Sequence, residues 1–138
     1  MATFPLEPVH DTFRAIATTV VPEAVALDRA GWERLEEIIA EALASRPERI
    51  HRQLRLFVRI VDWRARWRHR ERFVDLDPLQ RTRELERIER SRWLLLRRGL
   101  WGLRTLIFMG YYAQPAIQRE IGYRARPEGW DAVRGAGR

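Results

Sequence analysis

Apolar side chains recur at helical spacing along most of the chain, and this periodicity limits the possible folds more than any other feature. One such face, within residues 11–21, consists of Phe13, Ile16, Ala17 and Val20. Residues at these spacings lie on one side of an α-helix. No alternating run of polar and apolar residues reaches strand length, and no internal repeat of roughly 20–50 residues is present. The periodicity therefore predicts an all-α protein.

Residues that start or stop helices mark the helix boundaries. Asp, Ser and Thr cap helix N-termini, and Pro is favoured in the first turn. The predicted boundary residues are Asp11 or Thr12, Pro22, Asp28, Pro47 and the pair Asp77–Pro78. Three of the resulting helices cover about residues 11–21, 48–70 and 92–113, two more start at the caps of residues 28 and 77, and a short sixth helix covers residues 115–121. We expect a small helical bundle of about five helices, with this short sixth helix and an irregular C-terminal arm.

Each predicted helix has an apolar face that we expect to be buried. The expected core positions of the fourth and fifth helices are Leu79, Leu85, Ile88, Leu96, Leu100, Leu103, Ile107 and Tyr111. The fifth helix also contains Gly99, Gly102 and Gly110, each of which weakens a helix by about 1 kcal/mol relative to Ala. We expect these glycines to mark close helix packing.

The chain has 138 residues, the length of one domain. We expect a single helical domain over residues 1–138, with flexible ends at residues 1–10 and 131–138. The absence of Cys removes disulfides, thiolate catalysis and sulfur-ligated zinc. The first residues lack the basic and apolar regions of a secretory signal. Arg97, Arg98 and Arg104 interrupt the most apolar stretch, which argues against a bilayer span.

Positive charge is concentrated after Glu48. The first 48 residues carry four Arg and nine acids, net −5, whereas the rest carries 22 Arg and ten acids, net +12. The densest part, Arg49–Arg72, has nine Arg against two acids. Such an asymmetry indicates an acidic partner, a nucleic acid or an anionic surface. The alternative is a solvated helix face in an Arg-biased proteome, because the chain has 26 Arg and no Lys.

The residue types that carry most enzyme chemistry lack their usual spacing. No glycine-rich nucleotide loop or GxSxG motif is present, and His10, His51 and His69 stand in no metal-binding pattern. The carboxylates at positions 36, 37 and 41 have no accompanying ExxH motif and are expected on a solvated helix face. We therefore expect a protein that is not an enzyme and binds no cofactor or metal itself.

Exposed aromatic residues are expected beside arginines. Trp63, Trp67, Trp93 and Trp101 all lie near Arg in the sequence. Trp and Arg are enriched in protein interfaces, stack on nucleic-acid bases and also suit a membrane surface. Composition does not separate these three uses.

Three segments carry a family resemblance. The first is GYYxxP within Leu106–Pro115, followed by Ile121-Gly-Tyr123 and Gly129-Trp130. The second comprises Phe73–Arg81, Leu85 and Glu89–Ser91, and the third is Phe13–Pro22. Together these segments resemble the gluconate 2-dehydrogenase subunit 3 family, the helical accessory module of glucose–methanol–choline (GMC) flavoprotein oxidoreductases. The resemblance covers most of the chain, from about residue 13 to residue 130.

The resemblance implies a non-catalytic small subunit. Members bind a large FAD-dependent partner that oxidises alcohol, sugar or sterol hydroxyls, and they support its folding, stability or export. FAD is therefore expected in the partner and not in this chain. Exported members start with a twin-arginine signal, which this sequence does not show. A location in the cytoplasm or at the inner face of the cytoplasmic membrane is expected.

The candidate partner interface combines residues of the resemblance with the Arg-rich segment. It consists of Tyr112, Pro115, Trp130, Trp63, Trp67, Arg59 and Arg66. Tyr111 and Tyr123 are instead expected to lock the C-terminal arm onto the bundle. A peripheral membrane contact is a further candidate. The alternative function is an Arg-rich helical nucleic-acid-binding protein, against which stand the missing helix-turn-helix signature and the acids interleaved outside Arg49–Arg72.

Overall fold

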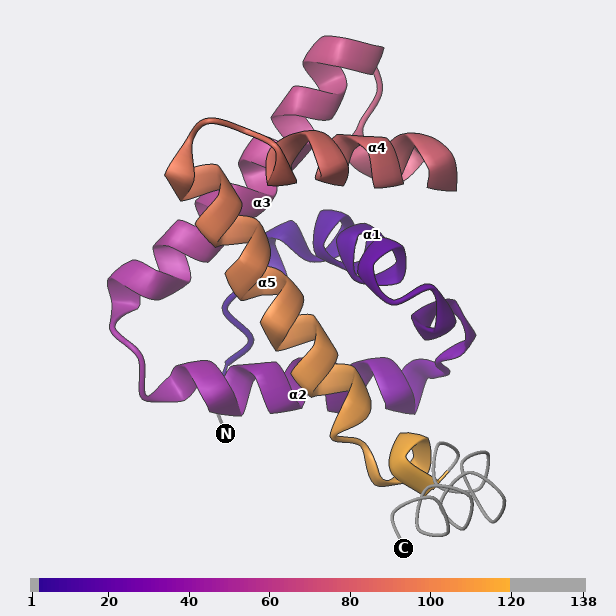
Figure 1. Cartoon of the computed structure of the whole chain (residues 1–138). Helices are drawn as coiled ribbons and strands as arrows, with labels where there is room; N and C mark the ends of the chain where they lie inside the picture. The colour runs from indigo at the N-terminus through magenta and orange to yellow at the C-terminus, as the bar shows by residue number, and fades with distance from the viewer. Residues whose placement is uncertain (1–2, 120–138) are drawn as a thin grey trace, which may run out of the picture.

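The computed structural model describes residues 3–119 and is all-α (Figure 1). Three 3-10 helices are η1 (Glu7–Val9), η2 (Pro22–Ala26) and η3 (Phe73–Asp75). The α-helices are α1 (His10–Val20), α2 (Arg29–Ala44), α3 (Glu48–His69), α4 (Pro78–Glu89) and α5 (Leu94–Tyr112). No strand occurs within residues 3–119. The predicted all-α bundle of about five helices is confirmed.

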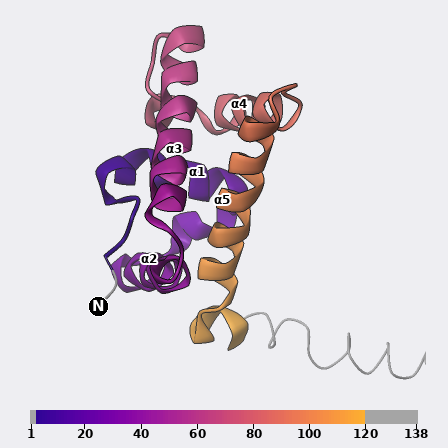
Figure 2. The ribbon, with the colours of Figure 1, turned by 90° about the vertical axis from the view of Figure 1, so that its left-hand side faces the viewer.

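Helix α1 lies at the centre of the packing. It contacts α3, α4, α5 and all three 3-10 helices, and Figure 2 places it between α3 and α5. Phe13 and Ile16 are fully buried on its inner face. The predicted caps Asp11 and Thr12 are wrong, because η1 runs directly into α1 and leaves Val9 as the capping residue without a side-chain hydrogen bond.

The predicted caps of α2 and α4 are confirmed. The Asp28 carboxylate accepts a hydrogen bond of 2.8 Å from the Gly31 backbone N–H. Asp77 and Gln80 form a reciprocal capping box, in which each side chain accepts from the other's backbone N–H. Pro47 precedes α3 as its capping residue rather than opening it as the first helical residue.

Glycines allow α5 to approach its neighbours closely at two of the three predicted positions. A Cβ on Gly99 would lie 2.5 Å from Cδ1 of Phe57 in α3, and one on Gly110 would lie 3.0 Å from the Leu35 carbonyl oxygen in α2. A Cβ on Gly102 would meet nothing within 4 Å, so close packing is the wrong explanation there. Helix α5 therefore crosses α3 near its start and α2 near its end, as Figure 1 shows.

Helix α4 covers the core with only part of its predicted face. Leu85 and Ile88 are buried as expected. Leu79 is 59% exposed, so its predicted core position is wrong. At 3.6 residues per turn, position 79 lies on the side of the helix opposite positions 85 and 88.

The predicted sixth helix begins at Pro115 and is helical to residue 119, where the described part ends. Its predicted end at Ile121 and the predicted C-terminal arm lie outside the described residues. The side-chain amide of Gln114, between α5 and this helix, donates to the backbone oxygens of Gly110 and Gly31. Gln114 therefore joins the end of α5 to the start of α2.

Candidate partner interface

The predicted interface residues fall into two groups at opposite ends of the molecule. Helix α3 carries four of them, Arg59, Trp63, Arg66 and Trp67, in its C-terminal half. Tyr112 and Pro115 lie at the far end of α5, away from this part of α3 (Figure 1). Trp130 lies outside the described residues.

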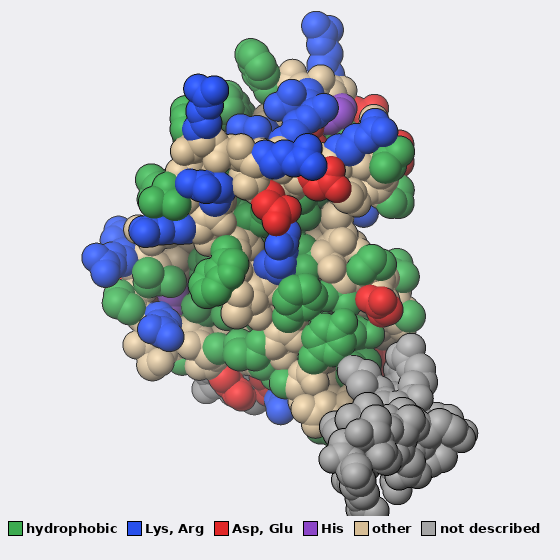
Figure 3. Space-filling model, in the orientation of Figure 1, with side chains coloured by type: hydrophobic (Ala, Val, Ile, Leu, Met, Phe, Trp, Pro, Cys, Tyr) green, Lys and Arg blue, Asp and Glu red, His purple; other side chains and the backbone are tan. Residues whose placement is uncertain are grey.

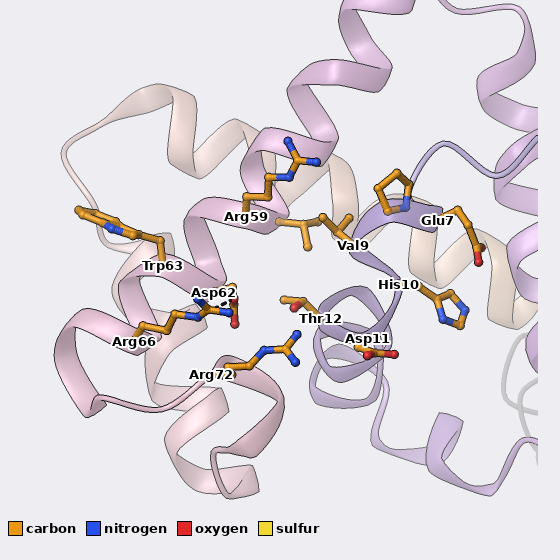
Figure 4. Close-up of a pocket in the computed structure, with 12 residues that line it drawn as sticks. Glu7, Val9, His10, Asp11, Thr12, Arg59, Asp62, Trp63, Arg66 and Arg72 are labelled. Carbon is orange, nitrogen blue, oxygen red and sulfur yellow. Dashed lines mark ion pairs between the residues drawn. The ribbon is translucent and has the colours of Figure 1, made fainter.

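Three of the α3 residues line one pocket. Arg59, Trp63 and Arg66 form one wall, and the opposite wall comes from η1 and the first turn of α1. The pocket has a volume of about 590 Å³ and is open to solvent. Figure 4 shows Arg66 and Arg72 reaching into it, whereas the Trp63 indole points away from its centre. The fold therefore brings Arg59, Trp63 and Arg66 of α3 together with residues of η1 and α1 around one pocket.

Asp62 holds the pocket's α3 wall in place. One of its carboxylate oxygens accepts from the Phe73 backbone N–H at 2.9 Å, and the other pairs with Arg66 Nε at 3.1 Å. Arg59 and Arg72 form no ion pair with any residue in the described range 3–119. These two guanidinium groups are therefore available to carboxylates of a partner.

The α3 surface beside the pocket is apolar as well as basic. The side chains of Trp63 and Trp67 are 62% and 79% exposed, and Leu56 on the same helix is also exposed. Exposed Trp next to Arg is the composition of interface hot spots. We refer to Arg59, Trp63, Arg66 and Trp67 together as the α3 surface.

Helix α5 has a second apolar side facing away from the core. Leu94, Trp101, Phe108 and Tyr112 are 48%, 70%, 39% and 39% exposed. With Thr105 they lie within about 60° of one another around the helix. We call these five residues the α5 stripe. The sequence contained this signal, because Leu94, Trp101 and Phe108 stand seven positions apart.

A buried carboxylate ties the end of α3 to α4. Glu84 is 1% exposed, and its Oε1 forms an ion pair with Arg68 Nε at 2.9 Å and hydrogen bonds with His69 Nε2 at 2.9 Å and Arg87 Nη1 at 2.8 Å. Its Oε2 has no hydrogen-bond partner within residues 3–119. Glu84 and its three partners therefore link α3 to α4. The residues next to Glu84 in the sequence do not predict this role.

The described residues of the family resemblance also serve the scaffold. Phe73 and Leu76 are buried, and the Arg81 guanidinium donates to the backbone oxygens of Phe73 and Val74. Tyr111 is buried at the end of α5. These segments shape the bundle and do not converge on one open site.

Metal and membrane-spanning features are absent from the described part. Residues 3–119 contain no group of three or more His, Cys, Asp or Glu placed to hold a metal ion. Glu36 of α2 pairs with His10 and Arg14 of α1. The expectation that this carboxylate lies on a solvated helix face is therefore wrong, because it links the two helices. No helix among the same residues is long and apolar enough to cross a bilayer.

No family model, curated protein or solved structure matches this chain. The family resemblance therefore depends on the motifs alone.

Proposed function

We propose that this protein is a non-catalytic accessory subunit that binds and stabilises a large GMC-type, FAD-dependent oxidoreductase. The partner would carry the FAD and act on alcohol, sugar or sterol hydroxyls. The complex would reside in the cytoplasm or at the inner face of the cytoplasmic membrane. The motifs in Phe13–Pro22, Phe73–Arg81 and Leu106–Pro115 support this choice of partner.

The observation that carries the proposal is the grouping of Arg59, Trp63 and Arg66 around one open pocket. A partner side chain that enters this pocket would lie against Val9 and meet the guanidinium groups of Arg59 and Arg72, while the exposed Trp63 indole would contact the partner beside the pocket. Interfaces of this kind are dominated by a few Trp and Arg residues in well-packed pockets. Binding to the folded partner alone would stabilise it by mass action.

The Arg-rich α3 helix makes nucleic acid the competing partner. The two possibilities differ in their response to salt. Binding to nucleic acid weakens steeply as salt increases, because neutralised phosphates release counterions. A protein interface with a large apolar part keeps most of its affinity.

The test is affinity purification of the tagged protein from its native cells, with nuclease and moderate salt. We expect a much larger chain to co-purify with the absorption spectrum of a flavin. The variant Trp63→Ser should reduce recovery of this chain by about tenfold or more, since hot-spot Trp residues contribute at least about 2 kcal/mol. The matched control is Trp93→Ser, which removes a similarly exposed Trp just before α5.

Two results would contradict the proposal. One is recovery of the protein without flavin or a large partner. The other is recovery only of nucleic acid, released by salt, when nuclease is omitted. Equal losses for the Trp63 and Trp93 variants would remove the α3 surface from the proposal and leave the partner assignment standing.

A further inference from the structure

The α5 stripe is an apolar helix face without a partner in the described structure. Leu96, Leu100, Leu103 and Ile107 are buried on one side of α5, and the stripe lies on the other side. A helix that is apolar on both sides is normally covered on both. In Figure 3 hydrophobic side chains gather over the part of the surface where Figure 1 shows α5.

The α5 stripe presents few polar groups that a covering surface would have to hydrogen-bond. The Thr105 hydroxyl donates to the Trp101 carbonyl at 2.8 Å, so its proton is already used within α5. The rings of Phe108 and Tyr112 contact each other, with centroids 6.0 Å apart. The nineteen residues of α5 extend for about 28 Å, so the stripe is a long, narrow ridge.

All charges around the stripe on its own segment are positive. Residues 90–119 contain six Arg and no Asp or Glu. Arg97 and Arg104 border one edge of the stripe and Arg98 borders the other, given 3.6 residues per turn. The acidic side chains on this face belong to neighbouring elements, such as Glu89, which pairs with Arg104 at 3.6 Å. The charge around the stripe is therefore complementary to an anionic surface.

A second copy of the chain fits this pattern poorly, because pairing two α5 stripes would bring Arg-bordered surfaces together. A lipid surface fits it well. Trp and Tyr prefer the boundary between headgroups and acyl chains, and long Arg side chains reach from an apolar face to the phosphates. A fluid surface also needs no matching cavity for the bulky Trp101.

We propose that the α5 stripe binds the surface of an anionic lipid bilayer, with Trp101 and Phe108 inserted among the headgroups and Arg97 and Arg98 at the phosphates. This surface is distinct from the α3 pocket, because η1 and α5 lie on opposite sides of α3 (Figure 2). The proposal is independent of the partner enzyme, so it can be tested with the protein alone.

The experiment is flotation of the full chain with vesicles of phosphatidylcholine alone and of phosphatidylcholine with phosphatidylglycerol. We expect binding to the anionic vesicles, a blue shift of the Trp emission on binding, and weaker binding as salt increases. The double variant Trp101→Gln with Phe108→Asn should bind about tenfold or more weakly, because membrane affinity follows the apolar area buried. Its matched control is Leu79→Gln with Leu56→Asn, two exposed apolar residues on α4 and α3, which should stay within about twofold of the unmodified protein.

A second pair of variants tests the charges without altering apolar residues. Arg97→Gln with Arg98→Gln should reduce binding to anionic vesicles about tenfold, whereas the exposed pair Arg49→Gln with Arg52→Gln should change it much less. If the variant Trp101→Gln with Phe108→Asn fails to fold, the comparison of these two Arg variants still tests the proposal. The proposal is overturned if the protein does not bind anionic vesicles, or if each test variant and its control behave alike.

Discussion

Two glycines three positions apart in α5 provide a direct test of how this helix packs. Replacing Gly by Ala stabilises a helix interior by about 0.5–1 kcal/mol. A Cβ on Gly102 would meet nothing within 4 Å, so Gly102→Ala should gain this amount. A Cβ on Gly99 would stand 2.5 Å from Cδ1 and 2.9 Å from Cγ of Phe57. The two substitutions therefore differ mainly in a steric contact.

The contact at Gly99 should outweigh the gain in helix propensity. Ordinary van der Waals contact begins at 3.4 Å, so the Phe57 ring would have to move by about 0.9 Å. Phe57 is buried, and overpacking of a core costs about 1–3 kcal/mol. The unfolding free energies of the two variants should differ by about 1–3 kcal/mol, with Gly99→Ala the less stable.

Thermal unfolding followed by circular dichroism measures this difference, because about 1 kcal/mol changes the Tm of a domain of this size by roughly 4 °C. Adding Phe57→Leu to each variant completes a double-mutant cycle and should relieve part of the cost only at Gly99. Equal Tm values for Gly99→Ala and Gly102→Ala would refute the close approach of α5 to α3.

Three further substitutions test individual features by the same unfolding measurement. Glu84→Gln should destabilise the protein by about 2–4 kcal/mol, because it removes the buried carboxylate charge that Arg68 and Arg87 pair with. Glu86→Gln on the exposed side of α4 should change little, and equal effects of the two substitutions would contradict the network around Glu84. Asp77→Ala should cost about 1 kcal/mol through loss of the capping box, and the exposed Asp75→Ala is its control; an unchanged Tm for Asp77→Ala would show that the cap contributes nothing. Arg70→Gly should stabilise by about 0.5–1 kcal/mol, because Arg70 ends α3 with a φ of 59° that glycine adopts without strain; a lower Tm would indicate that the Arg70 side chain matters more than its backbone conformation.

Much of the fold follows from local sequence signals. Asp28 and Asp77 cap the helices that they were expected to cap, since a cap depends on residues within one turn. The failed cap at Asp11 shows the limit of this reasoning, because η1 precedes α1 without a break. The predicted core position of Leu79 is wrong for a different reason. Leu79 is six residues from Leu85 and nine from Ile88, and these spacings do not place it on the same face of a helix.

The surfaces were less predictable than the helices. The pocket depends on Arg72 and α1 coming together beside α3, and the Glu84 network joins residues 15 positions apart. Both groups of residues form only when separate helices pack together, and the periodicity of the sequence does not predict which helices pack. The α5 stripe was different, because its spacing of seven residues is visible in the sequence. Only Trp101 and Tyr112 of this stripe are singled out from the sequence, because the complete core face on the same helix dominates its periodicity.

The contact between α2 and α5 has a consequence for folding kinetics. It is the most extensive helix–helix contact of the described residues, yet α3 and α4 intervene in the chain, and Gln114 donates to the Gly31 carbonyl from 83 positions away. Bundles in which each helix packs on the next close only short loops and fold fastest, whereas distant contacts require a large loop to be closed first. We therefore expect this chain to fold more slowly than an up-and-down bundle of equal length, with the docking of α5 on α2 as a late step.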